Sequence, residues 1–570
     1  MRHAALFLAA AIACPGVAAQ TRADFGVRIP MRDGVQLTAD VWRPEDGLRH
    51  PVLLVRTPYL RTGLGLVDWG RYFAERGYAF VAQDTRGRGD SDGEFSFFAG
   101  DGEDGYDTIE WLARQPWSNG KVGMLGVSYL GTVQWLAAKH RPPHLTCMAP
   151  TAPGGRWFDE LPYLGGAFAH AWALNWVNGT SGRTLQTPNA AGVDWERVLA
   201  HRPLLTADSV MGRVMPLYRS WLEHPVEGPF WRRIELRAED FAGIAIPTLT
   251  TTGWYDADQP GSLMYWRELM ANAPKPSEHF LVIGPWGHAE TFVGGKTRVG
   301  ELEFPPSVVI DNKQAHLDFF DWCLKGGGSY DAPRARIFVT GANEWRSYDS
   351  YPPKDVVPTP LYLASGGKAN GRSGDGRLVW RAEPRSLPDT FTYDPKRPVP
   401  AAIEVAAIDR QRLQDRPDVL VYTGESLREP LELIGSVFVD LTVASDALDT
   451  DFVAVLSDVH PDGKAVQLGS RIAIKRARYR NGYAREELLE PGRPTPIRIE
   501  LFDVAHRFPA GHRLRLEVTS SAAPYYNPNQ NTGNPVATDV DWKVAHQAVF
   551  HDASRPSVIT LPLLPRRAPR

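Results

Sequence analysis

Cysteine is scarce in this chain, and no cysteine and histidine spacing of the kind that binds zinc is present. Only three cysteines occur among 570 residues. Cys147 and Cys323 both lie in apolar surroundings, so one disulfide is the most that they could form, and we predict buried free thiols instead. The sequence therefore excludes a small disulfide-framed scaffold and a zinc-finger type of domain.

An excess of one charge is also lacking. The formal net charge of -3 comes from 63 basic and 66 acidic side chains. Such a balance provides neither a basic surface for nucleic acid nor a polybasic patch for membranes. We therefore expect a small-molecule partner, no nucleic acid and no membrane span, while the sequence leaves the oligomeric state open.

No apolar run is long enough to cross a bilayer. The run at residues 4–13 is short, follows the basic Arg2 and precedes the small residues Val17, Ala18 and Ala19. This pattern predicts a secretory signal peptide over residues 1–19 and an exported protein, periplasmic or extracellular. Lipidation at Cys14 is a minor alternative.

The chain is rich in glycine, proline and aromatic residues, with 52 Gly, 47 Pro and 18 Trp. A chain of this length predicts two to four domains. Residues 20–150 and 244–356 alternate short apolar strands with helical segments after an opening hairpin, which predicts a mostly parallel sheet with helices on both faces. Residues 151–243 are helical and rich in tryptophan, and predict an inserted cap. Residues 357–570 contain many short alternating strands and predict a β-sandwich.

The segment Lys121–His140 has the pattern of a nucleophile elbow. A short apolar strand ends in Gly126, Val127 and Ser128, and a helical pattern begins at once. Such a sharp turn lifts a serine hydroxyl to the rim of a sheet. The second glycine of the usual G-x-S-x-G is displaced, because Leu130 stands there and Gly131 follows.

A serine hydroxyl needs a base within hydrogen-bond reach and an acid that orients this base. Two strands that follow the cap end in such residues, Asp256 and His288. The order Ser128, Asp256, His288 is the order expected of this type of sheet. Each residue also has an ordinary interpretation, as a helix cap or a solvated loop side chain, and it is the joint order and placement that indicates a triad.

The oxyanion needs hydrogen-bond donors. We predict the backbone N–H of Tyr129, directly after the nucleophile, as one donor. Tyr59, in the loop after an early strand, is either a second donor through its phenol or a packing ring.

Beyond these residues, the chain resembles the cocaine-esterase-like hydrolases, which are related to Xaa-Pro dipeptidyl peptidases, glutaryl acylases and α-amino acid ester hydrolases. The resemblance covers nearly the whole mature chain and includes these motifs: Arg56-Thr57-Pro58-Tyr59, Gly126-Val127-Ser128-Tyr129-Leu130-Gly131, Gly253-Trp254-Tyr255-Asp256, Gly284-Pro285-Trp286-Gly287-His288 and Gly511-His512-Arg513-Leu514.

In that family Gly-x-Ser-Tyr-x-Gly is the usual elbow and a tyrosine hydroxyl serves the oxyanion hole, which favours Tyr59. The resemblance implies an α/β-hydrolase domain, a helical cap and a C-terminal jelly roll. It also implies acyl transfer through an acyl-enzyme, for which no metal or organic cofactor is required.

For substrate binding we single out the rings Phe168, Trp172, Trp176 and Trp254 as walls of an acyl pocket, although cap rings are often core. Asp258 could hold a substrate ammonium group, as a carboxylate cluster does in the α-amino acid ester hydrolases, or it could be a helix N-cap. Gln259 stands where that family has a further acid.

The cap residues Asp159 and Glu160 could supply the missing carboxylate. In the sandwich, the D-x-D at Asp449 and Asp451 predicts a turn rather than a calcium loop, and His512 is expected to be structural.

We therefore expect a secreted serine hydrolase that cleaves a small carboxylic ester or amide. Rival hypotheses are an Xaa-Pro dipeptidyl-peptidase-like, glutaryl-acylase-like or α-amino acid ester hydrolase activity. A rival of another class is a catalytically inert protein whose jelly roll binds a glycan.

Overall fold

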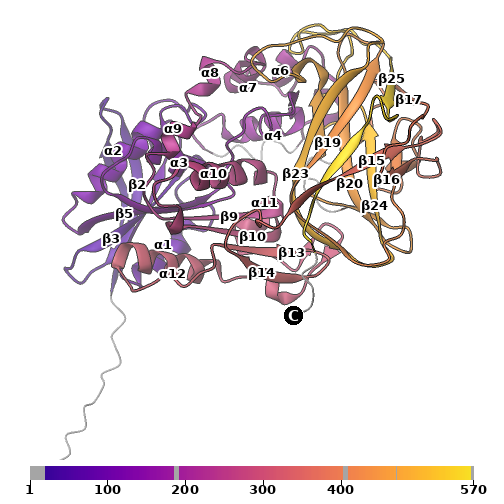
Figure 1. Ribbon diagram of the computed structural model, residues 1–570. Helices are drawn as coiled ribbons and strands as arrows, with labels where there is room; N and C mark the ends of the chain where they lie inside the picture. Colours follow the sequence, from indigo (N-terminus) through magenta and orange to yellow (C-terminus); the bar gives the residue numbers. More distant parts are fainter. Residues whose placement is uncertain (1–19, 185–191, 402–407, 470–471, 566–570) are drawn as a thin grey trace, which may run out of the picture.

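A computed structural model describes residues 20–184, 192–401, 408–469 and 472–565 (Figure 1). The predicted signal peptide, with Cys14, lies outside the described residues. In Figure 1 a helix-covered sheet in indigo to red lies beside a strand-rich body in orange and yellow. Within the described part of the chain, no helix is both long and apolar enough to span a bilayer.

The first body is built on a ten-stranded sheet. Its inner strands, from β4 to β13, pair in parallel, while the edge strands β1, β2 and β14 are antiparallel, which confirms the predicted opening hairpin. The spatial order is β1 (Thr21–Pro30), β2 (Gln36–Pro44), β4 (Ala79–Asp84), β3 (His50–Thr57), β5 (Ser118–Val127), β6 (Leu145–Thr151), β9 (Thr248–Tyr255), β10 (His279–Gly287), β13 (Ala335–Val339) and β14 (Glu344–Tyr348).

Helices cover both faces of this sheet, because its inner strands are apolar on both sides. In β3, Leu53 and Val55 join the core cluster under one helical layer, whereas Val52 and Leu54 join the cluster under the other. This alternation is typical of parallel sheets buried on two faces. The first layer contains α1 (Leu66–Ala74) and α12 (Asn312–Lys325), and the second contains α2 (Asp101–Ala113), α3 (Tyr129–Lys139) and α10 (Gln259–Asn272).

The prediction of free thiols is wrong. Cys147 in β6 and Cys323 in α12 form a disulfide, with their Cα atoms 6.4 Å apart. The two residues are 176 positions apart in the sequence, so only the packing of α12 across the sheet brings them together. An apolar sequence context fits a buried thiol and a buried disulfide equally well, which is why the local pattern failed.

The cap lies between β6 and β9 and consists of short helices whose tryptophans stack. The rings of Trp172, Trp176 and Trp221 lie about parallel, with centroids 5.8 to 6.1 Å apart. Its elements are β7 (Tyr163–Leu164), β8 (Ala167–Phe168), α4 (His170–Thr180), α5 (Trp195–Ala200), α6 (Ala207–Val210), α7 (Pro216–Glu223), α8 (Pro229–Arg232) and α9 (Ala238–Phe241). After the cap, α11 (His288–Thr291) follows β10, and β11 (Arg298–Val299) pairs with β12 (Leu302–Glu303).

The second body is the expected β-sandwich. Its strands are almost all antiparallel and enclose one apolar core. They are β15 (Val357–Ala364), β16 (Arg377–Val379), β17 (Asp389–Tyr393), β18 (Leu420–Thr423), β19 (Leu431–Ser445), β20 (Asp451–Val459), β21 (Ala465–Gln467), β22 (Ala473–Arg476), β23 (Thr495–Phe508), β24 (Arg513–Thr519), β25 (Ala545–Phe550) and β26 (Val558–Leu563).

The D-x-D segment at the start of β20 forms ion pairs inside this sandwich. Asp449 pairs with Arg478 at 2.7 Å, and Asp451 pairs with Arg476 at 2.9 Å. All four side chains are buried. Because each carboxylate already neutralises a buried guanidinium, these oxygens serve the fold of the sandwich and do not fit a calcium loop.

Candidate active site

Ser128 is held in a strained turn between β5 and α3. Its backbone has φ 61° and ψ −126°, a region that residues other than glycine rarely adopt. Strain of this kind persists only where the surrounding structure enforces it, and it is typical of functional sites. The geometry is that of a nucleophile elbow, with Ser128 at the carboxyl end of a central strand.

Two glycines make room for this turn and explain the displaced motif. A Cβ on Gly126 would lie 2.5 Å from the Cβ of Leu130. A Cβ on Gly131 would lie 2.8 Å from the backbone oxygen of Thr151 in the neighbouring strand. The close approach therefore falls at Gly131, one position later than in G-x-S-x-G, and Leu130 packs into the core instead.

Asp256 and His288 follow the neighbouring parallel strands β9 and β10. The buried carboxylate of Asp256 accepts hydrogen bonds from the Thr252 hydroxyl at 3.0 Å and from the Asp258 N–H at 2.9 Å. Its Oδ1 also lies 2.8 Å from Nδ1 of His288. A proton on Nδ1 suits this contact, which leaves Nε2 as the basic nitrogen of the ring.

Tyr59, in the loop after β3, presents its phenol at Ser128. The phenolic oxygen accepts a 3.0 Å hydrogen bond from the indole N–H of Trp176 in the cap, and the Ser128 side chain is a further hydrogen-bonding neighbour. Burial raises the pKa of Tyr59 to about 12. The phenol is therefore protonated at neutral pH and can donate to a developing negative charge.

Tyr129 contributes its backbone and its side chain in different ways. Its N–H belongs to the first turn of α3, where N–H groups have no carbonyl within the helix. Its phenol donates to the carboxylate of Asp101 at 2.6 Å, and Asp101 in turn pairs with buried Arg56 at 3.1 Å. The ring stacks on Phe98 with centroids 4.0 Å apart. This network fixes the start of α3, and so the position of the elbow.

A narrow aromatic cavity of about 40 Å³ opens at Ser128. Three of the five residues predicted to bind substrate line it, namely Trp172, Trp176 and Asp258. The other two lie elsewhere. Phe168 is fully buried in the cap core beside Tyr163 and Tyr218, and the indole of Trp254 donates to the carbonyl of Phe338 in β13. Their interpretation as pocket walls was wrong, because both rings pack inside the molecule.

Several residues that line this cavity were not predicted from the sequence. Phe97 and Phe98 line it from the loop after β4, and Trp157, Leu161 and Thr132 complete it. The only sequence signal was an aromatic pair in a loop at the carboxyl end of a parallel strand, which is where such sheets bind ligands.

Carboxylates also gather here. Asp258 occupies the N-cap position of α10, but its side chain makes no capping hydrogen bond. A Cβ on Gly154, another residue lining the cavity, would lie 3.8 Å from Oδ2 of Asp258 and 3.6 Å from Oε1 of Glu160. Asp258 therefore lines the cavity, and the buried Glu160 lies behind Gly154, where its Oε2 accepts hydrogen bonds from the N–H groups of Gly155 and Arg156. Asp258 Oδ2 is also 3.8 Å from His288 Nδ1.

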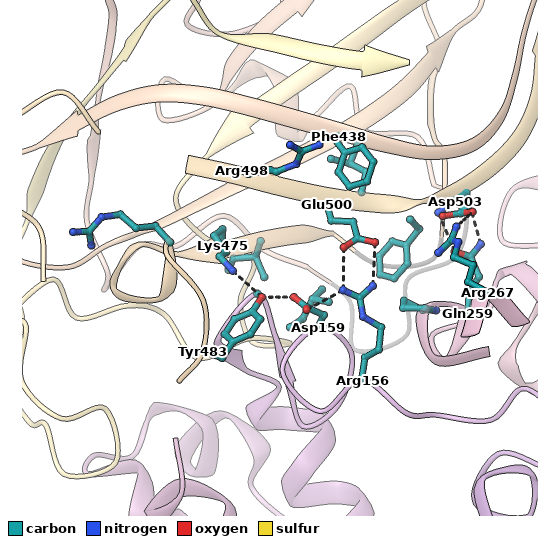
Figure 2. A pocket seen from close by; sticks show the side chains of 17 residues that line it. Arg156, Asp159, Gln259, Arg267, Phe438, Lys475, Tyr483, Arg498, Glu500 and Asp503 are labelled. Atoms are coloured by element: carbon teal, nitrogen blue, oxygen red, sulfur yellow. Dashed lines mark hydrogen bonds and ion pairs between the residues drawn. The ribbon is translucent and has the colours of Figure 1, made fainter. Parts of the chain in front are cut away.

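Gln259 and Asp159 lie instead at a second cavity, of about 250 Å³, between cap, α10 and sandwich. In Figure 2 the Arg156 side chain points at Glu500 and Asp159, and the Arg267 side chain points at Asp503, whereas Arg498 lies against the ring of Phe438. Arg156 pairs with Glu500 and with Asp159. The Gln259 amide exchanges two hydrogen bonds with the backbone of Asp503, which a carboxylate could not do. Glutamine at this position thus joins α10 to the sandwich.

Comparisons with known proteins agree with this geometry. Residues 33–290 match the family model of the X-Pro dipeptidyl-peptidase (S15 family), and residues 328–560 match the X-Pro dipeptidyl-peptidase C-terminal non-catalytic domain. Cocaine esterase of Rhodococcus sp. (strain MB1 Bresler) is 34% identical, over 95% of this chain and 98% of that protein. The chain belongs to the cocaine-esterase-like family.

This hydrolase is also similar to solved structures of two relatives. An aminopeptidase from the marine sediment archaeon Thaumarchaeota archaeon is 26% identical with a TM-score of 0.85, covering 96% of this chain and 97% of that one. An α-amino acid ester hydrolase is 26% identical with a TM-score of 0.84, covering 97% and 98%. The chain is accordingly a serine hydrolase of the α/β-hydrolase fold, as predicted.

Proposed function

We propose that this protein cleaves small carboxylic esters through an acyl-enzyme on Ser128, with His288 as general base and Asp256 as the acid that orients it. The observation that carries the proposal is the 2.8 Å contact between His288 Nδ1 and buried Asp256, next to Asp258, which lines the same cavity as the strained Ser128. In this mechanism His288 Nε2 takes the proton of Ser128 and later protonates the leaving group, and water releases the acyl group.

The oxyanion of the tetrahedral intermediate is bound by the Tyr59 phenol and the Tyr129 N–H. Support comes from the raised pKa of Tyr59, which keeps the phenol a donor, and from the position of Tyr129 at a helix N-terminus, where N–H groups favour negative charge. Tyr59→Phe is expected to lower kcat about 10² to 10³-fold, the usual effect of losing one oxyanion donor.

For the acyl group we propose a flat apolar or aromatic acid. The cavity at Ser128 is narrow and is walled by Phe97, Phe98, Trp157, Trp172 and Trp176. Ring faces of this kind bind flat apolar groups through offset or edge contacts. The name of the relative cocaine esterase supports an ester rather than an amide as substrate.

The test is fluorophosphonate labelling together with a panel of small esters and amides. Wild type is expected to be labelled and to hydrolyse aromatic esters, while Ser128→Ala loses both. Ser209→Ala, at an exposed serine of the cap, is the matched control and keeps both. Failure of the folded wild type to label would contradict a serine hydrolase and would favour the inert glycan-binding alternative.

A second candidate is hydrolysis of α-amino acid esters. It is favoured by Asp258, which lines the cavity with the buried Glu160 close by at Gly154, and by the likeness to an α-amino acid ester hydrolase and an aminopeptidase. Two esters that differ only in an α-amino group decide it. If the ammonium is bound, Asp258→Asn lowers kcat/KM for the amino ester at least 10-fold and leaves the other ester within about 3-fold, because an ion pair is lost in only one case.

Adding an Xaa-Pro anilide and a glutaryl amide to the same panel separates the remaining rivals. Cleavage of the Xaa-Pro anilide faster than of any ester would indicate a dipeptidyl peptidase, and preference for the glutaryl amide would indicate an acylase.

We also propose that the protein is exported. The apolar leader at residues 1–19 supports this, and so does the disulfide Cys147–Cys323, because such bonds persist in oxidising compartments. Expression of the full chain in a bacterial host should give a periplasmic or secreted protein that begins at Gln20. A protein retaining the leader in the cytosol, or one lipidated at Cys14, would contradict the soluble exported form.

A further inference from the structure

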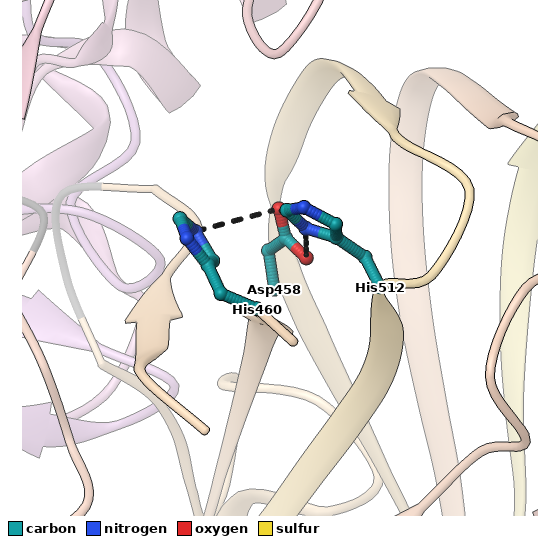
Figure 3. A group of neighbouring side chains, drawn as sticks. All are labelled: Asp458, His460 and His512. Carbon is teal, nitrogen blue, oxygen red and sulfur yellow. Dashed lines mark hydrogen bonds and ion pairs between the residues drawn. The ribbon is translucent and has the colours of Figure 1, made fainter. Parts of the chain in front are cut away.

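A cluster of histidines surrounds one buried aspartate at an end of the sandwich (Figure 3). Asp458 is near the end of β20, His460 follows that strand, and His512 precedes β24. Nδ1 of His512 lies 2.8 Å from Oδ1 of Asp458, and Nε2 of His460 lies 3.9 Å from Oδ2. Ligand atoms of all three residues lie within 4.8 Å of one another.

We propose that Asp458, His460 and His512 bind a divalent transition-metal ion of the zinc type. Two imidazole nitrogens and one carboxylate oxygen are a donor set that suits zinc and its neighbours, whereas calcium and magnesium prefer oxygen ligands alone. Ligand atoms about 2 Å from a tetrahedral ion lie roughly 3.3 Å apart. The observed spacings therefore need only small side-chain rotations around the ion.

The pairing of two strands brings the three side chains together. Strands β20 and β24 pair antiparallel, with Asp458 opposite Leu514 and Val459 opposite Arg513. The end of one strand thus lies beside the start of the other. His460 is held in a tight turn, because its N–H donates to the Lys464 carbonyl at 2.8 Å.

A further histidine orients Asp458 through a hydrogen bond, as is usual for carboxylates that bind metals. Its Oδ2 lies 3.2 Å from Nε2 of His506. Nδ1 of His506 in turn lies 2.8 Å from the hydroxyl of Thr340, just after β13 of the hydrolase sheet.

Access from solvent comes through His460, whose side chain is 34% exposed, while the side chains of His512 and Asp458 are 14% and 6% exposed. Three protein ligands leave a fourth position for water. Because the cluster joins two strand ends and reaches Thr340 through His506, a bound ion would stabilise the contact between the sandwich and the hydrolase domain.

The test uses the full mature chain without a histidine tag, freed of metal by a chelator. Zinc titration by calorimetry, and metal analysis after gel filtration, should give one zinc per chain and a raised thermal unfolding midpoint, with no comparable effect of Mg²⁺ or Ca²⁺. His460→Ala and His512→Ala should each weaken zinc binding at least 10-fold. His546→Ala, at an exposed histidine on β25 of the same sandwich, should bind as wild type does.

Because His460 is near the surface, His460→Ala should melt as metal-free wild type does, so that its loss of binding does not reflect unfolding. A second group, Asp256, Asp258 and His288, also has ligand atoms within 4.8 Å of one another. Zinc retained by His460→Ala but lost in His288→Ala would overturn the proposal. So would the absence of saturable binding in the wild type.

Discussion

The indole N–H of Trp176 in α4 donates a 3.0 Å hydrogen bond to the phenolic oxygen of Tyr59 after β3. This bond joins the cap to the proposed oxyanion site. Because the phenolic oxygen accepts from the cap, the phenol's own O–H is directed away from the indole, and the Ser128 side chain is its other hydrogen-bonding neighbour. The cap thus orients a donor of the proposed chemistry as well as enclosing the acyl pocket.

Trp176→Phe keeps an aromatic ring in the pocket but removes the indole donor. We expect kcat to fall about 10-fold, because a factor of this size corresponds to the net free energy of one hydrogen bond. Trp172→Phe is the matched control, since Trp172 stacks on Trp176 in the same wall. It should change KM and leave kcat within about 2-fold. Equal effects of both variants on kcat would show that ring size, and not the hydrogen bond, is what matters.

The raised pKa of Tyr59 should make the free energy of unfolding decrease as the pH rises in the alkaline range. An ordinary tyrosine has a pKa of about 10, and that of Tyr59 is about 12. Its contribution is therefore complete below pH 10 and is lost as the pH rises toward 12, because the unfolded chain releases this proton first. Urea unfolding between pH 8 and 11 should show a steeper loss of stability above pH 10 in wild type than in Tyr59→Phe. Identical slopes would mean that Tyr59 does not titrate abnormally.

The disulfide between Cys147 and Cys323 should stabilise the fold without affecting catalysis. It closes a loop with a sequence separation of 176, and native disulfides typically contribute about 2 to 4 kcal/mol. We expect reducing agent to lower the thermal unfolding midpoint of the wild type, and the double variant Cys147→Ala, Cys323→Ala to melt at the reduced value whether or not reductant is present. Its kcat should match the wild type. A midpoint insensitive to reduction would contradict a stabilising disulfide.

A functional residue could be predicted from the sequence only where the pattern that indicates it lies in the neighbouring residues of the chain. Ser128, Asp256 and His288 could be singled out because each follows a short apolar strand. The disulfide, and the approach of Glu160 to Asp258 beside Gly154, depend on packing between segments far apart in the chain. The periodicity of a sequence does not reveal such packing.

The aromatic residues predicted to line the pocket show the same limit of prediction from sequence. Trp254 lies two residues before Asp256, yet its indole donates to the carbonyl of Phe338 and its ring packs in a buried apolar cluster with residues of β10 and β13. Trp172 and Trp176 lie one helical turn apart on α4, so one face of that helix presents both to the cavity. Sequence alone could not tell which of these rings faces solvent or substrate.

His170 should make the cap sensitive to acid. It opens α4, is buried, and its Nδ1 lies 3.2 Å from the hydroxyl of Tyr218. Burial, with a smaller contribution from Arg202, lowers the pKa of His170 to about 3. Between pH 6.5 and 3 the unfolded chain therefore binds a proton that the folded chain excludes. As the pH falls through this range, this one group should lower the free energy of unfolding by about 1.4 kcal/mol for each pH unit.

His170→Asn removes that titration while keeping a polar atom near Nδ1. Denaturant unfolding at pH 7, 6 and 5 should show a shallower pH dependence for the variant than for wild type. Parallel curves would assign the acid sensitivity to other groups. His546→Asn, at an exposed histidine of the sandwich, should follow the wild-type curve.

Gly131 should be a position of the elbow that does not tolerate a larger side chain. An alanine Cβ there would lie 2.8 Å from the Thr151 carbonyl and 3.3 Å from Pro153, and a backbone oxygen in the middle of a sheet cannot move aside cheaply. We expect Gly131→Ala to cost about 1 to 3 kcal/mol, the usual range for overpacking, and to lower kcat more than 10-fold because Ser128 is displaced.

Gly228→Ala is the control for this substitution. Its backbone is extended, and the atom nearest to an added Cβ would be the backbone oxygen of Val226, 4.0 Å away, so both stability and kcat should stay near wild type. If Gly131→Ala were as stable and active as wild type, β6 would have to yield around the new methyl group. In that case the tight contact between α3 and β6 would not be what holds Ser128 in position. The strain at Ser128 would then be imposed by Gly126 and β5 alone.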